Sequence, residues 1–277
     1  MLRQVILPGP ELAPYIRNFM VSGFSSLENH LPAVASSQLV FYFNGGASLL
    51  GGSAGSGIVP QAFIAGPTLA PRTFRVQPGS EFVGIMFRPS GLQACLGLPA
   101  HICNGQIVPL EHFLPKPDVE QILEQLAGRQ SASDRVGLIE KFLLRAMLKA
   151  SSKIVTLPAL SMAQLLQPAK NLAQTFSLST RQLERRFLVS YGMPLRDYRR
   201  LSRFSLALAQ LMFEPPRAGG LTRVAQDSHY VDQSHFIRDF RQFIGDTPLN
   251  LLKAFDGEES IYRLWRLTRR ELDMYAD

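Results

Sequence analysis

The chain is poor in cysteine, with only Cys95 and Cys103 among 277 residues. Their spacing matches no zinc or redox motif, and two cysteines are too few for a disulfide framework. No apolar run reaches the roughly 18 residues that a membrane span needs. The N-terminal stretch also lacks the apolar region of a secretory signal. These absences favour a reduced, cytoplasmic protein that has no membrane partner.

The patterns of the common enzyme sites are also absent. The histidines of the first half, His30, His101 and His112, are scattered and form no H-x-H pair. A metal-dependent cupin needs two or three close histidines and a carboxylate. The sequence contains no G-x-S-x-G, Gly-rich phosphate loop or Cys/His nucleophile pattern. We therefore expect no catalytic residue, no metal and no cofactor, and a cupin-type enzyme is the least favoured function.

Positive charge is plentiful and unevenly distributed. The formal net charge is +7 and the sequence pI is about 9.7. Residues 168–255 hold 13 Lys and Arg against 7 Asp and Glu, and 11 of those 13 are Arg. Because Arg suits bidentate contact with guanine or phosphate, this region favours a polyanionic partner.

One stretch in this basic region, 229–248, predicts a helix with two different faces. Asp232 is a good N-cap, Gly245 a good C-terminal residue, and Pro248 prevents continuation. The apolar residues at helical spacing, which form one buried stripe, are Phe236, Phe240, Phe243 and Ile244. The outward side chains, which suit base edges and phosphates, are Gln233, Ser234, His235, Arg238 and Arg241. Residues 221–230 read as a short helix and a tight turn, which completes a helix-turn-helix.

A second helix-turn-helix is predicted over 171–187. Ser179 and Gln182 form a capping box that marks the start of its second helix. Leu183 and Phe187 face inward. The other surface carries Arg181, Gln182, Glu184, Arg185 and Arg186. A charged surface of this kind is either a solvated face or a DNA-reading face, and the helix-turn-helix setting favours the second.

A long helix is predicted between the two units, from about Leu195 to Phe213. It would span about 28 Å at 1.5 Å per residue, which suits two recognition helices about one DNA turn, ~34 Å, apart. Its predicted apolar stripe is Tyr198, Leu201, Ser205, Leu208 and Met212.

The pattern Y-x-D-Q-S-H-F-x-R-x-F-(x)4-G-x-T-P, carried by residues 230–248, resembles the signature of the AraC/XylS family of bacterial transcription regulators. The resemblance implies two homeodomain-like recognition helices. The base-reading residues it implies are Arg181, Gln182, Glu184 and Arg185 in the first, and Gln233, Ser234, His235 and Arg238 in the second. The phosphate contacts that we expect are Ser179, Arg203 and Arg241. His229 departs from the family, which has Gly in this turn, where a positive φ is often needed.

Residues 1–115 read as mostly β, punctuated by Gly and Pro. Strands are predicted at 38–45 and 62–67, and 46–57 reads as a flexible loop or a loosely held hairpin. Residues 72–91 are predicted to form one hairpin around Pro78-Gly79. Its inward positions are predicted to be Phe74, Val76, Phe82 and Met86. A small barrel or sandwich would fit this pattern.

Roughly residues 10–115 resemble the poorly characterised N-terminal domain of one AraC-type subgroup. The wider family implies a cupin-like β-barrel that binds a small effector or mediates dimerisation. Arg75 and Arg88 could bind an acidic effector, or be solvated or paired on the surface. Phe43 is the candidate ligand platform, although Phe41, Phe43, Phe74 and Phe87 more often belong to a core.

Residues 118–150 change to amphipathic helices. In the second helix, Val136, Ile139, Leu143 and Met147 form one stripe, which Leu144 and Leu148 widen. Such helices would either bridge the β domain internally or mediate a homodimer. A further helix is expected from Asp256, either docked on the DNA-binding unit or binding a partner.

The sequence therefore predicts an α+β chain in two domains, a β-barrel or sandwich with helices and an all-α double helix-turn-helix. The expected parts are 1–115 (regulatory), 116–157 (helical linker), 158–255 (DNA-binding) and 256–277 (C-terminal helix). The expected function is sequence-specific transcription regulation on double-stranded promoter DNA, controlled by a small effector or by dimerisation, with RNA polymerase as a further partner. A module whose primary activity is small-molecule sensing is the alternative.

Overall fold

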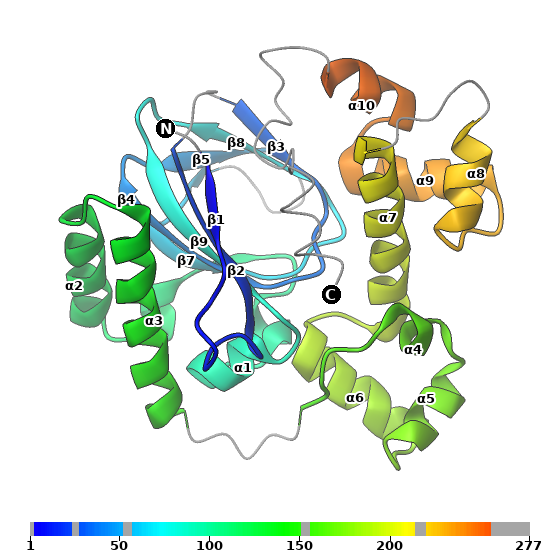
Figure 1. The fold of residues 1–277 in the computed structure, drawn as a ribbon, viewed down its shortest axis with the longest axis horizontal. Coiled ribbons are helices and arrows are strands. Elements are labelled where there is room, and N and C mark those ends of the chain that lie inside the picture. The colour runs from blue at the N-terminus through cyan, green and yellow to red at the C-terminus, as the bar shows by residue number, and fades with distance from the viewer. Residues whose placement is uncertain (1–2, 24–27, 52–56, 151–155, 214–219, 256–277) are drawn as a thin grey trace.

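A computed structural model describes residues 3–23, 28–51, 57–150, 156–213 and 220–255. The N-terminal half is rich in strands and the C-terminal half is helical (Figure 1). The strands are β1 (Gln4–Ile6), β2 (Ile16–Gly23), β3 (Glu28–Leu31), β4 (Gln38–Asn44), β5 (Ala47–Leu50), β6 (Gly57–Ile58), β7 (Ala62–Ala65), β8 (Arg72–Val76), β9 (Glu81–Phe87) and β10 (Ile107–Pro109). The predicted strands at 38–45 and 62–67 are confirmed as β4 and β7.

The helices of the N-terminal half are α1 (Gly91–Leu96), α2 (Lys116–Ala127) and α3 (Ala132–Lys149), with the 3-10 turns η1 (Ala100–Cys103) and η2 (Leu110–His112). Those of the C-terminal half are α4 (Met162–Leu166), α5 (Ala169–Thr175), α6 (Thr180–Tyr191), α7 (Leu195–Phe213), α8 (Gly220–Asp227), α9 (Gln233–Ile244) and α10 (Pro248–Phe255). None of the helices in the described ranges has the length and apolar character that crossing a membrane requires.

A six-stranded antiparallel sheet, in the order β1-β2-β9-β4-β7-β10, forms the centre of the N-terminal half. One row of its register joins Phe19 to Ile85, Leu39 and Ile64 across four strands, and each of the four is 0% exposed. Because side chains alternate between the faces of a strand, this row lies on one face of the sheet. That face packs against α2 and α3 through Ile122, Ile139 and other apolar residues.

A second sheet, in the order β3-β8-β5-β6, covers part of the opposite face. Tyr42 and Phe82 of the large sheet meet Phe74 and Val76 of the small one in a single apolar cluster. No strand is shared between the two sheets in the described residues, so the arrangement is a sandwich and not a closed barrel. The barrel form of the prediction is therefore wrong and the sandwich form is confirmed.

The hairpin predicted over 72–91 is also wrong. The chain does turn at Pro78-Gly79, where Gly79 has φ 76°. However, β8 pairs with β3 and β5, whereas β9 pairs with β2 and β4. The turn therefore carries the chain from one sheet to the other. Of the two alternatives predicted for 46–57, the described residues agree with the hairpin, because β5 and β6 pair with each other.

Helices α2 and α3 lie on the outer side of the large sheet (Figure 1), as the internal-bridge interpretation of residues 118–150 expects. Val136, Ile139 and Leu143 are buried there. Leu148, in contrast, is 91% exposed, whereas Leu144 and Met147 are partly buried against the same core.

The boundaries of the predicted connecting helix are confirmed by α7, Leu195–Phe213. Its apolar stripe differs from the prediction, because Ser205 is exposed while Phe204, Ala207 and Leu211 are buried. The buried stripe of α7 is thus shifted by about one residue from the predicted one. It packs against Phe236, Phe240 and Phe243 of α9 in one cluster. The helix predicted from Asp256 lies outside the described residues.

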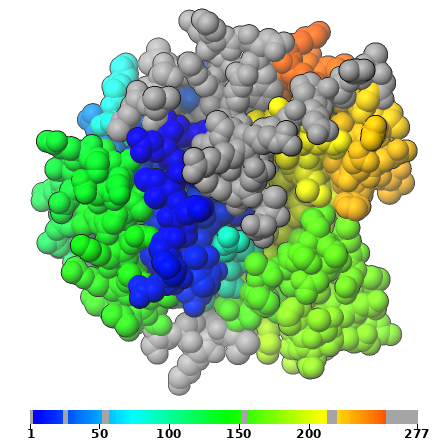
Figure 2. All heavy atoms as spheres, in the orientation of Figure 1, coloured from blue at the N-terminus to red at the C-terminus, as the bar shows by residue number. Residues whose placement is uncertain are grey.

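The two halves are in direct contact. The amide of Ala33 donates to the carbonyl of Phe243 at 2.8 Å, and His30 Nε2 lies 2.5 Å from the carbonyl oxygen of Ile244. The amide of Ser90 donates to the carbonyl of Ser190 at 2.8 Å. In Figure 2 the first strands (blue) lie between α2–α3 (green, left) and the helical half (right). The β-rich half therefore holds the C-terminal ends of both α6 and α9.

At Gly192 the contact between the two halves leaves no room for a side chain. It ends α6 with φ 79°, and a Cβ built on it would lie 2.6 Å from Pro67 Cγ and 3.1 Å from the carbonyl oxygen of Ala100. We predict that Gly192→Ala lowers the free energy of unfolding by about 2 kcal/mol, from the left-handed backbone and the clash together. Urea unfolding of the whole chain measures the change.

Gly137 provides the matched control. It lies inside α3, and a Cβ there would have nothing within 4 Å. Gly137→Ala should therefore stabilise the chain by about 0.5–1 kcal/mol. Equal stability of Gly192→Ala and the wild type would contradict the proposed close approach at Pro67.

Candidate nucleic-acid interface

The first helix-turn-helix consists of α5 and α6. Ser179 Oγ accepts from the amide of Gln182 at 3.2 Å, and Gln182 Oε1 accepts from the amide of Ser179 at 2.9 Å, which confirms the predicted capping box. Leu183 and Phe187 are 0% exposed. Phe187 stacks on Tyr191 with ring centroids 4.0 Å apart. This packing turns the opposite side of α6 to solvent.

Tyr191 also fixes α6 to the segment before it. Its hydroxyl donates to the carbonyl of Pro158 at 2.7 Å and accepts from the amide of Leu160 at 2.9 Å. Burial raises the pKa of Tyr191, and the nearby Tyr198 adds to the effect. The phenol therefore remains protonated and can both donate and accept.

The second helix-turn-helix consists of α8 and α9. Asp232 Oδ1 accepts from the amide of His235 at 2.7 Å, so the predicted N-cap is confirmed. Gly245 ends α9 with φ 88°, also as predicted. The buried stripe Phe236, Phe240, Phe243 and Ile244 is 0% exposed throughout.

The two turns share one backbone conformation. Ser177 and His229 have φ 53° and 62°, and each amide donates to a carbonyl three residues earlier at 3.0 Å. The next amides, of Leu178 and Tyr230, donate five residues back at 2.9 Å. The position at which the sequence has His in place of the family glycine is thus one that requires positive φ. The second turn is one residue longer before its cap, and the extra Val231 is 88% exposed.

The predicted base-reading residues of α6 are exposed, but not all of them are equally free. Arg181, Glu184 and Arg185 point away from the core. Gln182, although exposed, uses its side-chain oxygen in the capping box. Ser179 is likewise engaged through its hydroxyl in that box.

On α9, Ser234, Arg238 and Arg241 are exposed and line a surface hollow together with Ile237. Gln233 is half-buried and accepts from Thr222 Oγ1 at 2.8 Å, which ties it to α8. The hollow is therefore formed by side chains of one helix face, and it contains both predicted arginines of α9, Arg238 and Arg241.

His235 lies between the surface and the interior. Its side chain is 35% exposed, its ring meets Tyr230 edge-on with centroids 5.4 Å apart, and its Nε2 lies 3.8 Å from Asp239 Oδ2. Asp239 itself is 1% exposed and accepts from Arg200 of α7 at 2.6 Å. Sequence reasoning missed this ion pair, which links the second recognition helix to the connecting helix.

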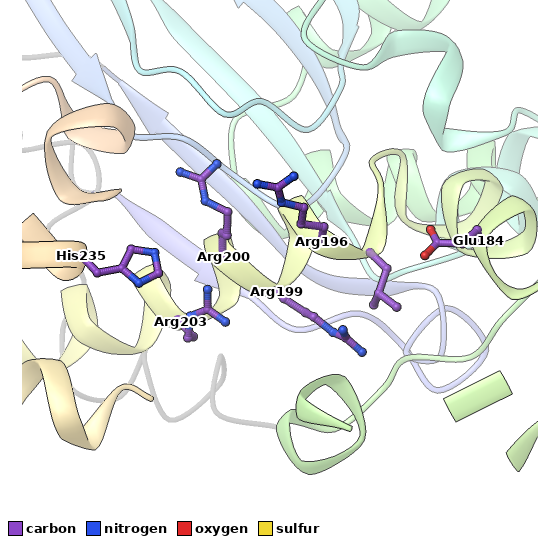
Figure 3. A pocket seen from close by; sticks show the side chains of 7 residues that line it. Glu184, Arg196, Arg199, Arg200, Arg203 and His235 are labelled. Atoms are coloured by element: carbon purple, nitrogen blue, oxygen red, sulfur yellow. The ribbon is translucent and has the colours of Figure 1, made fainter. Parts of the chain in front are cut away.

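A cleft of about 300 Å³ runs along α7 between the two recognition helices. Glu184 of α6 lies at one end and His235 of α9 at the other, with α7 arginines between them (Figure 3). The arginines that line it are Arg196, Arg199, Arg200 and Arg203. Of these, only Arg203 had been predicted as a phosphate contact. Burial lowers the pKa of Arg199, and the nearby Glu184 opposes that shift.

The effector candidates of the N-terminal half do not converge. Phe43 is buried on the helix-covered side of the large sheet, with the Arg135 guanidinium 4.1 Å from its ring centroid. Arg75 pairs with Glu28 at 2.7 Å on the small sheet. Arg88 Nε donates to the carbonyl of Ala13 at 3.1 Å. Each is engaged with a different segment, as expected of residues with a structural role.

The two cysteines are buried and free, and burial raises the pKa of Cys95 to about 12 and that of Cys103 to about 11. Both thiols therefore stay protonated and unreactive at neutral pH. In the part of the chain that the structure describes, no three His, Cys, Asp or Glu residues gather as a metal site would require.

Two family models match the chain. Residues 172–254 match a helix-turn-helix domain, and residues 4–109 match a domain of unknown function, DUF6597. The first match covers both helix-turn-helix units with α7, and the second covers both sheets. None of the curated proteins matches the chain.

Solved structures that match the chain include ToxT from Vibrio cholerae, at 12% identity over 85% of this chain and 97% of that one, with a TM-score of 0.46. ToxT from strain O395 bound to (E)-4-(8-methylnaphthalen-1-yl)but-3-enoic acid also matches at 12% identity, over 91% and 99%, with a TM-score of 0.46. The AraC-like transcriptional activator CuxR matches at 13% identity over 76% and 88%, with a TM-score of 0.26.

The strained turn before α9 gives a direct test of the local structure. We predict that His229→Gly stabilises the chain by about 0.5–1 kcal/mol, because relief of the left-handed strain exceeds the extra entropy of glycine in the unfolded chain. His229→Val should destabilise it, since a β-branched residue tolerates φ 62° poorly. Thermal unfolding measures both variants, and a stabilising His229→Val would refute the assigned turn.

Proposed function

We propose that the chain is a DNA-binding transcription regulator of the AraC/XylS family, whose signature residues 230–248 resemble, and that it reads a specific promoter sequence with α6 and α9. Each helix would enter one of two successive major grooves on the same face of the duplex. The observation that carries the proposal is the matched pair of capped helices, joined by α7, whose outward faces are rich in arginine. Affinity would come from phosphate contacts and specificity from base edges.

The side chains proposed to read bases are those with free polar groups on these faces. On α6 they are Arg181, Glu184 and Arg185, and on α9 they are Ser234, His235 and Arg238. Gln182 and Gln233 remain candidates through the amide nitrogen that their intramolecular hydrogen bonds leave unused. Glu184 would accept from a cytosine amine or orient a neighbouring arginine. Ser179, Arg203 and Arg241 are proposed to contact phosphate.

We predict that Arg185→Ala and Arg238→Ala each weaken binding to the preferred duplex by about 1–3 kcal/mol and relax base preference at one position. Both side chains are exposed, so the loss should come without loss of stability. In vitro selection with each variant, followed by fluorescence anisotropy on selected and random duplexes, measures the effect. Equal weakening on both duplexes would contradict the base-reading role.

Arg241→Ala is the matched comparison, because Arg241 lies on α9 one turn beyond Arg238. It should weaken binding to every duplex alike and reduce the slope of log K against log[salt] by about 1. An unchanged salt slope would contradict the phosphate contact.

We further propose that the N-terminal half controls DNA binding, through a small effector or through dimerisation. The support is the set of backbone contacts that tie it to the ends of both recognition helices, at Phe243, Ile244 and Ser190. Movement of the β-rich half would shift one recognition helix relative to the other. RNA polymerase is a further proposed partner of the bound regulator.

The control proposal predicts that duplex binding alters amide exchange far from the DNA. The amide of Ala33 is the probe, because it donates to the carbonyl of Phe243 at the end of α9. Hydrogen–deuterium exchange of the whole chain should show changed protection over 28–35 when the selected duplex is added. Unchanged exchange there, with protection of α6 and α9, would mean that the two halves are not coupled.

A further inference from the structure

Of the four arginines on one face of α7, only Arg203 has been given a role so far, as a proposed phosphate contact. Arg199 and Arg200 each lie three or four residues from both Arg196 and Arg203, so the four arginines occupy one side of the helix. The apolar side of α7 is already buried against α9. On the arginine side, Arg200 and Arg203 also lie over the rings of Phe243 and Tyr230, whereas Arg196 makes no such contact among the described residues.

The charges on this face are only partly compensated inside the molecule. Arg200 is held by Asp239 at 2.6 Å and by Gln242 Oε1 at 2.7 Å. Arg199 donates to the carbonyl of Gln167, which is uncharged. Glu184 also lines the cleft near Arg199, so two carboxylates, Glu184 and Asp239, oppose four arginines and positive charge is left over along the cleft.

Two guanidinium groups of the cleft also have unused donors. Among the residues that the structure describes, neither Arg196 nor Arg203 has an ion-pair partner. The Nε groups of Arg199 and Arg203 are buried and have no hydrogen-bond partner in the same part of the chain. An unpaired buried donor favours an incoming acceptor, because its desolvation is otherwise uncompensated.

The position of the cleft identifies the acceptor. Its ends are formed by Glu184 and His235, one from each proposed reading helix (Figure 3). When two helices occupy successive major grooves on one face of B-DNA, the minor groove and its two bordering backbones lie between them. Phosphodiester oxygens are the groups there that pair with guanidinium.

We propose that the cleft on α7 is a phosphodiester-binding site that grips the DNA backbone where the minor groove faces the protein. This inference rests on the proposed function and adds a third contact, with Arg196 and Arg203 supplying the unpaired charges. The contact is independent of base sequence. It holds the centre of the site while α6 and α9 read its two ends.

Arg196 is the residue to change, because it is exposed and, among the described residues, makes no hydrogen bond or ion pair that holds the fold. Arg196→Ala should reduce the slope of log K against log[salt] by about 0.9 and weaken binding about eightfold at 0.1 M salt. Arg196→Lys should retain most of the slope, since the charge remains. Arg145→Ala on the exposed side of α3 is the control for net charge, because it removes the same single charge, and it should leave the slope near that of the wild type.

Fluorescence anisotropy across a salt series, with the selected duplex and a random duplex, gives the slopes. A second arm uses the selected duplex with neutral methylphosphonates at the central phosphates that border the minor groove. The wild type should bind this duplex more weakly, and Arg196→Ala should show little further loss on it. Such non-additivity ties Arg196 to those phosphates.

Three results would overturn the proposal. An unchanged slope for Arg196→Ala, while Arg241→Ala lowers the slope, removes the cleft contact and leaves the proposed function intact. A loss that depends on the central base sequence replaces phosphate binding by minor-groove reading. Absence of salt-dependent binding of any duplex by the wild-type chain removes the proposed function and this inference together.

Discussion

The ion pair between Arg200 and Asp239 is the constraint on which the geometry of the helical half depends. Asp239 is 1% exposed on the inner side of α9, and burying an unpaired carboxylate would cost several kcal/mol. The pair therefore favours one rotation of α9 about its axis, with Asp239 facing α7. That rotation turns Ser234, Arg238 and Arg241 outward, so a residue that touches no ligand determines which side chains are presented.

Repulsion between arginines on one face destabilises the connecting helix α7. Like charges at three- and four-residue spacing each cost about 0.2–0.5 kcal/mol, and α7 has four such arginine pairs on one side. The opposite side offsets the cost, because Leu201, Phe204 and Leu211 are fully or almost fully buried. Burial of one such side chain contributes about 1.5–3 kcal/mol. Packing thus holds the helix, and the arginine face remains available to an anion.

Features set by near neighbours in the sequence were predictable, such as the caps at Ser179 and Asp232 and the limits of α7. The hairpin failed because Pro78-Gly79 specifies a reversal of the chain but not which strands then pair. The rotated stripe on α7 failed because Leu201 and Leu208 fit two neighbouring stripes, and only the position of α9 distinguishes them. Asp239 was missed although its place among Phe236, Phe240 and Phe243 was a signal: a carboxylate inside an apolar stripe needs a cationic partner. The engagement of Gln182 followed from the capping-box spacing, whereas the bond of Gln233 to Thr222 depends on a contact between two helices that spacing does not encode.

The extra residue Val231 makes the two helix-turn-helix units unequal, and so do the side chains that they expose. A symmetric dimer of identical units binds a palindromic DNA site, whereas one chain with two different units does not. Any duplex that satisfies both would be asymmetric and would have a direction. Inverting such a DNA site would place the β-rich half over the DNA on its other side. The order of α6 and α9 along one chain would then fix the direction in which the protein lies on the DNA, without any second subunit.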